Sequence, residues 1–205
     1  MNKIVLAGLV TGEPAFSHEI YGEKFYKFFL SSSRGSGTCD IIVCTISEII
    51  KNDIESGSKI KVFGEIRTRN VHENDKSHLE ITVFVKEVLL YEKDENIVEL
   101  DGFVCKLPNY RETPLGRKIA ELIVASNRER NFKSDYIPCI AWGRNAIRSS
   151  MIETGTRVKV LGRLQSREYN KKIDDEKYEV RTAYELSASM VDVVEESEEI
   201  NESSN

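Results

Sequence analysis

The sequence has 205 residues, of which 40% are hydrophobic, and this is enough to bury a core and excludes wholesale disorder. No apolar stretch approaches the ~20 residues that cross a bilayer, and the first residues lack the features of a secretory signal. We therefore expect a cytoplasmic protein without membrane contacts. The net charge of −5 divides unevenly, because residues 1–95 carry −3, residues 96–191 carry +4 and residues 192–205 carry −6. An acidic C-terminal segment thus masks a basic second half.

Catalytic and metal-binding patterns are absent from the sequence. Cys39, Cys44, Cys105 and Cys139 form no CxxC pair, so we expect no metal site and no cofactor. Cys44 and Cys139 lie in apolar runs, where a reduced thiol behaves as a small buried hydrophobe. The three histidines all fall in the first half, without a nucleophile–base arrangement or a phosphate-binding loop. An enzyme is therefore the least supported class of function.

The first half of the chain reappears in the second. The matching segments, in chain order, are residues 4–8 with 98–102, 22–34 with 116–128, 40–44 with 135–139, and 57–64 with 155–162. The offset between them drifts by only a few residues, as expected when insertions lie in loops. The repeat predicts two tandem domains, residues 1–95 and 96–191, followed by a disordered acidic tail, residues 192–205.

Each copy has the pattern of short strands separated by turns. In residues 157–160 the alternation places Val158 and Val160 on one face of a strand. Residues 147–152 have the apolar spacing of one or two helical turns, and they precede a glycine turn. About five strands and one short helix in each copy predict an all-β chain of two tandem OB-folds, which are small Greek-key barrels. Glycines suited to the bulges that bend a sheet into a barrel recur at equivalent positions, Gly8 with Gly102 and Gly64 with Gly162.

Four short motifs follow one another in the second copy. They are TPLGRK (113–118), ASNR (125–128), AWGRNA (141–146) and GRLQSREY (162–169). In this order and spacing they resemble the bacterial single-stranded-DNA-binding protein family (SSB) over residues 97–194. The first copy resembles the family more faintly, through residues 2–5, 22–24, 33–34 and 64–69. The resemblance implies OB-folds that bind single-stranded DNA during replication, recombination or repair.

The resemblance also implies which residues contact DNA. Family members stack unpaired bases on aromatic side chains along a basic groove. Tyr136, Trp142 and Tyr169 stand at three of the aromatic positions of the family. A fourth position has no clean match, because Arg130 stands there and Phe132 lies two residues further on.

The residue pattern of the second copy agrees with a stacking surface. Tyr136 and Trp142 have the same parity on one predicted strand and should emerge on the same face. Tyr169 alternates with arginines on the next long strand, and such a face suits single-stranded DNA, because rings stack on bases while guanidinium groups follow phosphates. The alternative is that the aromatic rings are half-buried in the core. The expected phosphate contacts are Arg128, Arg163 and Arg167.

The two copies differ at these positions. Where the second copy has its three aromatic residues, the first carries Ile41, Ser47 and Val71, and Glu65 replaces Arg163. We therefore interpret the first copy as a scaffold or assembly domain. Family members usually present four OB-folds, so a chain with two copies implies a homodimer, and a self-contained pseudo-dimer is the alternative.

Other partners stay open at this point. The chain could instead be an OB-fold protein-interaction or assembly module with residual nucleic-acid affinity, bound to replication, recombination or mobile-element proteins. Single-stranded RNA is a further possible partner, because stacking discriminates poorly between the two nucleic acids. Acidic tails of the family end in a hydrophobic tip that docks replication and repair proteins, and residues 201–205 lack one. We expect this tail to screen the basic groove, and we expect the protein to associate with the nucleoid.

Overall fold

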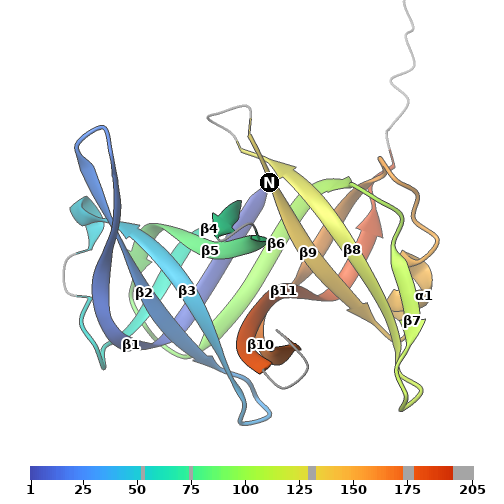
Figure 1. Ribbon diagram of the computed structural model, residues 1–205, viewed down its shortest axis with the longest axis horizontal. Coiled ribbons are helices and arrows are strands. Elements are labelled where there is room, and N and C mark those ends of the chain that lie inside the picture. The colour runs from blue at the N-terminus through green and yellow to red at the C-terminus, as the bar shows by residue number, and fades with distance from the viewer. Residues whose placement is uncertain (52–53, 74–75, 129–132, 173–177, 196–205) are drawn as a thin grey trace, which may run out of the picture.

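The computed structural model describes residues 1–51, 54–73, 76–128, 133–172 and 178–195, and β-strands dominate it (Figure 1). The first half contains β1 (Asn2–Ile20), β2 (Glu23–Ser33), β3 (Cys39–Ser47), the 3-10 turn η1 (Glu48–Ile50), β4 (Lys59–Glu73) and β5 (Lys76–Leu89). The second half contains β6 (Glu95–Val104), β7 (Asn109–Glu112), β8 (Lys118–Asn127), β9 (Ser134–Trp142), α1 (Arg144–Ser149), β10 (Arg157–Lys172) and β11 (Tyr178–Val193). Among these described residues, no helix is long and apolar enough to cross a membrane.

Each half closes into a five-stranded barrel. The first barrel has the strand order β2-β3-β5-β4-β1, and β1 pairs back to β2. The second has the order β6-β10-β11-β9-β8, β8 pairs back to β6, and β7 extends the sheet beside β8. One neighbouring pair in each barrel is parallel, β3 with β5 and β9 with β11. This is the arrangement of the OB-fold, so the predicted fold class is confirmed.

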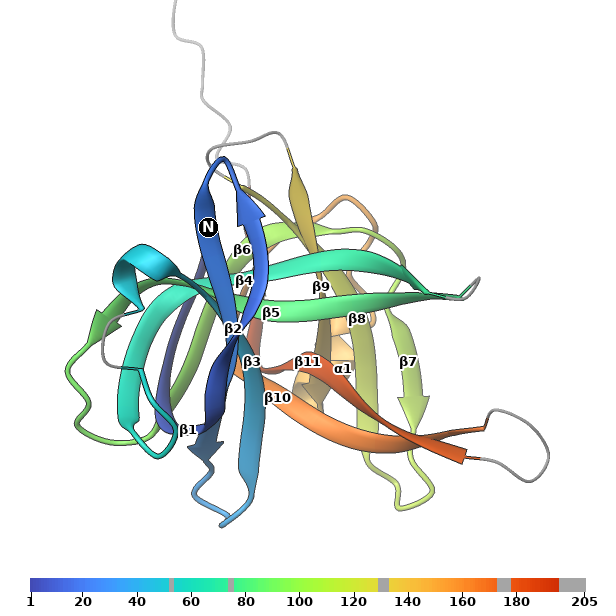
Figure 2. The ribbon, with the colours of Figure 1, turned by 60° about the vertical axis from the view of Figure 1, so that its left-hand side comes forward.

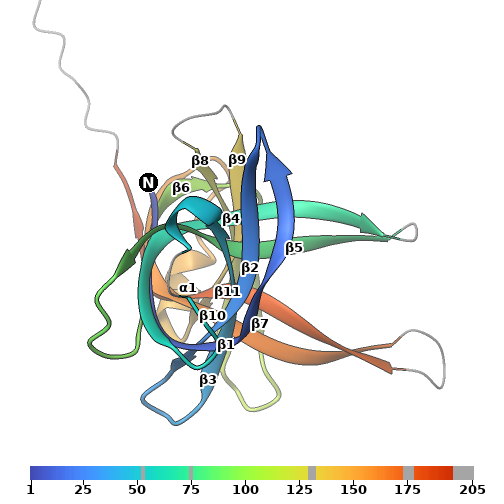
Figure 3. The same cartoon turned by 90° about the vertical axis from the view of Figure 1, so that its left-hand side faces the viewer.

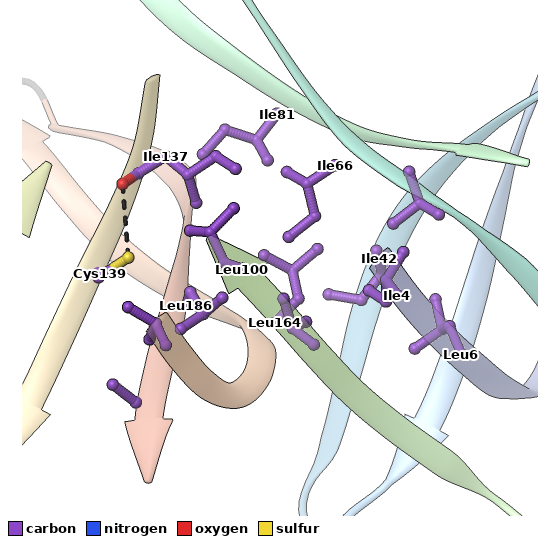
Figure 4. Close-up of a cluster of buried hydrophobic side chains, with 14 of the residues drawn as sticks. Ile4, Leu6, Ile42, Ile66, Ile81, Leu100, Ile137, Cys139, Leu164 and Leu186 are labelled. Atoms are coloured by element: carbon purple, nitrogen blue, oxygen red, sulfur yellow. Dashed lines mark hydrogen bonds between the residues drawn. The ribbon is translucent and has the colours of Figure 1, made fainter. Parts of the chain in front are cut away.

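The two barrels share one hydrophobic core. Side chains alternate between the two faces of each strand, and on β9 this buries Ile137 and Cys139. Figure 4 shows side chains of both barrels, among them Ile4 and Leu100, meeting in a continuous cluster. As predicted, Cys44 and Cys139 are buried, and burial raises the pKa of both thiols.

The repeated glycines serve two different purposes. The β4–β5 pairing shifts register at Gly64 and the β10–β11 pairing shifts at Gly162, so the predicted bulges are present there. The described pairings show no register shift at Gly8 or Gly102. A Cβ at any of these four glycines would come within 2.1 to 2.2 Å of a carbonyl oxygen of the neighbouring strand. All four therefore permit close strand packing, and Gly64 and Gly162 also lie at bulges.

The helical segments also differ from the prediction. Helix α1 covers Arg144–Ser149 and therefore begins three residues before the predicted segment 147–152. The first barrel has only the 3-10 turn η1 at the equivalent place, where the Ser47 side chain accepts a hydrogen bond from the Ile49 amide. Adjacent isoleucines at 49 and 50 disfavour a longer helix, because β-branched side chains lose rotamer freedom in one.

Antiparallel pairing of β1 with β6 joins the barrels into one eleven-stranded sheet. Ile4 pairs with Val98, and these residues occupy equivalent positions in the two repeated segments. The pairing is therefore symmetric about this point, and the two barrels are related by an approximate two-fold axis. Contacts between the barrels consequently recur in equivalent pairs.

Two long hairpins, β4–β5 and β10–β11, project from the barrels on the same side of the molecule (Figures 2 and 3). At the base of each hairpin an asparagine extends the barrel ladder. Asn2 exchanges two hydrogen bonds with the backbone of Ile66, of 2.7 and 3.0 Å. Asn96 does the same with the backbone of Leu164, at 2.7 and 2.9 Å. Beyond these asparagine hydrogen bonds, each hairpin projects from its own barrel.

Strand β11 continues to Val193, two residues past the predicted end of the second domain. Asp192 pairs with Lys159 and Val193 with Val158, so the first two residues of the predicted tail belong to the barrel. The alternation of buried residues in β11 is interrupted by the bulge after Ala188, and Val191 beyond it is buried again, which anchors the end of the strand. Residues 196–205, which make up most of the predicted disordered tail, lie outside the described residues.

Candidate nucleic-acid interface

Strand β9 presents two aromatic rings on one face. Tyr136 is 52% exposed and Trp142 is 38% exposed, whereas Ile137, Cys139 and Ala141 between them are buried. The two rings are six residues apart, which is about 20 Å along an extended strand. Neither ring belongs to the buried core, so the alternative of core packing does not describe them.

Arg163 lies on the same face as Trp142. Strand β11 connects them, because Ser187 of β11 pairs with Arg163 on one side and with β9 on the other. The guanidinium of Arg163 donates to the Gln165 side chain at 3.0 Å, and its Nε lies 3.9 Å from the Asp40 carboxylate of the first barrel. About a third of the side chain is exposed. A partly shielded cation therefore accompanies the tryptophan.

The remaining predicted contacts of this surface lie on the β10–β11 hairpin. Arg167 is 60% exposed, and its Nε is 3.9 Å from the Glu185 carboxylate. Tyr169 is 38% exposed, as Trp142 is, and pairs across the hairpin with Arg181. Because β11 pairs with β9 only at residues 186–188, this part of the hairpin extends beyond β9 and projects from the molecule (Figures 2 and 3). The structure thus places Tyr169 and Arg167 on a projecting hairpin, and Arg167 is still close enough to Glu121 of β8 to help lower the pKa of that carboxyl.

Arg128 is held in an ion pair. Its Nε and Nη2 donate to the two carboxylate oxygens of Asp135 at 2.8 and 2.7 Å, and this hydrogen bonding raises the pKa of Arg128. Nη2 also contacts the backbone carbonyl of Thr68, at 3.4 Å. The side chain is 20% exposed, so its role as a phosphate contact stays a prediction. Arg130 and Phe132 lie outside the described residues.

Asp135 is the centre of a buried cluster to which both barrels contribute. Burial by itself would raise its pKa, but hydrogen bonds from Arg128, from the Thr68 amide and from Arg67 outweigh burial and lower the pKa. The Thr68 amide donates to Asp135 at 2.7 Å, and Arg67 Nη1 donates at 3.1 Å. Thr68 and Arg67 belong to β4 of the first barrel, so this cluster joins the barrels next to Tyr136.

An equivalent cluster surrounds Asp40 in the first barrel. Arg34 Nε donates to Asp40 at 2.7 Å, and the Ser166 amide of the second barrel donates to it at 3.0 Å. Sequence reasoning missed both clusters and assigned Arg128 to phosphate alone. The available signal was that this Arg–Asp pair recurs in both copies, whereas the aromatic positions do not.

The first barrel has a cavity where the second barrel carries Trp142. Ser47 is buried at the equivalent position and donates to Glu23. The cavity measures about 490 Å³. Its lining consists of Glu23, Ser47, Ile49, Ile50, Glu65, Arg67, Phe84, Val85, Lys86 and Arg128. Glu65, which replaces Arg163 here, is ion-paired to both Arg67 and Lys86, so its charge is compensated.

Within the described ranges, no group of three or more His, Cys, Asp or Glu side chains is placed to hold a metal ion. The four cysteines are free thiols, and Cys39 alone among them is fully exposed. The interface described above therefore consists of aromatic rings, guanidinium groups and hydrogen-bonding side chains of the chain itself.

Comparison with known proteins shows the family of this chain. The model of the Single-strand binding protein family matches residues 95–194. Single-stranded DNA-binding protein B of Bacillus subtilis is 32% identical over 80 residues, which span 36% of this chain and 71% of that protein. The chain belongs to the single-strand binding protein family. Single-stranded DNA-binding protein 2 of Listeria monocytogenes is a further family relative, 28% identical over 106 residues, which span 47% of this chain and 66% of that protein.

The family model matches one half of this chain, and the curated relatives match between 36% and 48% of it. The chain spans 66% and 61% of the first two curated relatives. A solved structure covers both barrels, because the wild-type single-stranded DNA binding protein from Thermus aquaticus has a TM-score of 0.73 over 96% of this chain and 94% of that chain. At 20% identity this likeness shows the shared fold.

Proposed function

We propose that this chain binds single-stranded DNA without sequence preference, through the aromatic face of its second barrel. The observation that carries the proposal is the pair of half-exposed rings, Tyr136 and Trp142, on one face of β9 beside Arg163. Membership of the single-strand binding protein family and the names of its relatives, which are single-stranded DNA-binding proteins, support it. By the same family argument we propose a role in DNA replication, recombination or repair.

The proposed mechanism combines stacking with electrostatic attraction. Each base stacked on an aromatic ring contributes about 1–3 kcal/mol, and this gain is tolerant of sequence because every base has a π face. Arg167 is exposed and is therefore our first candidate for a phosphate contact. Arg163, on the same face as Trp142, is the second candidate. Tyr169 on the projecting hairpin offers a third ring for the continuing strand.

We further propose that residues 1–95 act as a scaffold and residues 96–191 as the binding domain. The first barrel supplies half of the common sheet and of the buried core. Its equivalents of the stacking residues are aliphatic or polar, and its Glu65 is held by two cations. Contacts to bases therefore concentrate on the second barrel.

We also propose that two copies of the chain associate as a homodimer. The joined sheet has an outer face on which partly exposed apolar residues occupy neighbouring strands. Val5 pairs with Phe63 on one side and with Ile97 on the other, and Leu161 pairs with Met190. Sedimentation of wild type and Ile97→Lys tests this. A wild-type mass of one chain would contradict the proposal.

The first experiment is a titration with dT oligonucleotides of several lengths, in which the fluorescence of the single tryptophan, Trp142, is followed at two salt concentrations. We expect strong quenching and weaker binding at higher salt, because the ring stacks on bases and cations release their counterions. A parallel titration with rU oligonucleotides compares RNA. Unmoved fluorescence without binding would contradict the proposal and favour the protein-interaction module.

A further inference from the structure

Each barrel has an open seam between its parallel strands. Strand β9 pairs with β11 only at residues 139–141, and β3 pairs with β5 only at residues 44–45. The strands diverge before these points, so backbone amides near the start of β9 and β3 face the gap. An amide left there without a partner is costly to bury.

Thr68 of the first barrel fills the seam of the second. The amide of Tyr136 donates to Thr68 Oγ1 at 2.9 Å, and the Thr68 amide donates to Asp135 at 2.7 Å. The Thr68 carbonyl accepts from Arg128 at 3.4 Å. All three polar groups of Thr68 therefore contact the other barrel, and its side chain is buried.

Ser166 of the second barrel makes the equivalent contact in return. The amide of Ile41 donates to Ser166 Oγ at 2.9 Å, and the Ser166 amide donates to Asp40 at 3.0 Å. The two contacts are alike in geometry but differ in what they hold. Thr68 holds the residue that carries an exposed aromatic ring, whereas Ser166 holds an isoleucine.

We propose that Thr68 is a positioning residue for the DNA-binding surface: from the first barrel it holds the start of β9 and so orients the ring of Tyr136. The inference rests on the proposed function and extends it, because the binding surface of the second barrel is then incomplete without the first. Strand β9 is held at Tyr136 by β8 on one side and by Thr68 on the other. Losing the second contact frees this end of the strand to move.

The experiment compares three variants of the full chain: Thr68→Val, its rescue Thr68→Ser, and the matched control Ser166→Ala. Each is titrated with dT oligonucleotides, and its unfolding is measured in parallel. Thr68→Val removes the hydroxyl with little change of volume. We expect it to weaken DNA binding by about threefold or more, and by no more than the loss of one base stacked on a ring. We expect Thr68→Ser to restore wild-type affinity, and Ser166→Ala to stay within about twofold of it while losing comparable stability.

A double-mutant cycle with Tyr136→Ala separates positioning from general loosening. If Thr68 acts through Tyr136, Thr68→Val has almost no further effect on affinity in the Tyr136→Ala background. An equal loss in both backgrounds, an equal loss in Ser166→Ala, or no loss in Thr68→Val would each overturn the inference while leaving DNA binding intact. A wild-type chain that does not bind, or a Tyr136→Ala variant that binds like wild type, would instead overturn the proposed stacking function.

Discussion

The two barrels are nearly equivalent in their interior and in their mutual contacts, and they differ on the outer faces of β3 and β9. Three features occur once in each barrel. They are the Arg–Asp ion pair, the asparagine that hydrogen-bonds at the base of the hairpin, and the hydroxyl that accepts a hydrogen bond from the other barrel at the seam. On β9 the outer face carries Tyr136 and Trp142, and on β3 the same positions carry Ile41 and Ser47.

This difference separates what the shared fold requires from what the surface does. The β1–β6 pairing and the seam contacts need a residue from each barrel, so neither barrel can lose them without cost to the other. An exposed stacking ring takes no part in these contacts between the barrels. One barrel can therefore lose its rings while the fold keeps its symmetry.

The largest expected effect concerns the two buried aspartates. Asp135→Ala leaves Arg128 without its buried partner and removes one of the two carboxylates that bind Arg67, and breaking a buried pair in this way costs about 3–5 kcal/mol of stability. We expect Asp40→Ala to cost less, because Arg34 is the one arginine within hydrogen-bond distance of Asp40 in the described residues, whereas Arg163 lies at 3.9 Å. Urea unfolding of both variants measures the difference. Equal losses would mean that the Arg67 contact adds no stability.

The same carboxylate makes stability depend on pH. The pKa of Asp135 is lowered in the folded chain, so its stabilisation is complete above the unfolded pKa of about 3.9 and is lost as the pH falls through the lower folded value. We expect urea midpoints of wild type to decrease in this acid range and those of Asp135→Asn to decrease less. An identical pH dependence in the variant would contradict this assignment.

A smaller effect distinguishes the two outer faces. Tyr136→Ala removes one stacking ring, and we expect it to weaken DNA binding by about 1–3 kcal/mol. Ile41 is 48% exposed at the equivalent position, so Ile41→Ala is the matched control, and we expect its affinity to stay near wild type. Oligonucleotide titrations followed by Trp142 fluorescence measure both. A comparable loss in Ile41→Ala would show that the first barrel shares the contact.

Arg167 and Arg69 occupy equivalent positions on the two hairpins. Substituting them tests the electrostatic contribution to DNA binding. Arg167 is 60% exposed and 3.9 Å from Glu185, whereas Arg69 is hydrogen-bonded to Glu80, which also binds Lys27. We expect Arg167→Ala to reduce the slope of log K against log salt by about 0.7, the value for one phosphate contact on a single strand. Arg69→Ala should change it less. The reverse order would place the phosphate path on the first hairpin.

The smallest expected difference between the barrels is in the reactivity of their buried thiols, which measures how readily each barrel opens. Cys44 and Cys139 are equivalent and buried, and burial raises the pKa of both, so they should react with a thiol reagent only when their barrel opens. Cys39 is exposed and should react first. We expect Cys44 and Cys139 to react at similar rates, because the barrels share one core. Mass spectrometry of partly labelled protein identifies the site, and a much faster Cys44 would show that the first barrel opens alone.

Local patterns in the sequence were sufficient for the fold class, the repeat and the parity of β9. Alternation of side chains is a property of the strand itself, so it predicted that Tyr136 and Trp142 share a face and that Val158 and Val160 share one, on which both valines are buried. Recurring motifs carried the family resemblance. The bulges at Gly64 and Gly162 followed from glycines at repeated positions.

The contacts between the barrels were decided only by the tertiary structure. The pairing of β1 with β6 brings Thr68 within hydrogen-bond distance of Asp135 and Tyr136, 67 and 68 residues away in the chain. Arg128 hydrogen-bonds to that same buried carboxylate, and Tyr169 lies on the β10–β11 hairpin rather than on β9 with the other two rings. A strand pattern specifies which face a side chain occupies, but it does not specify which surface packs against that face, because packing depends on how distant strands are brought together.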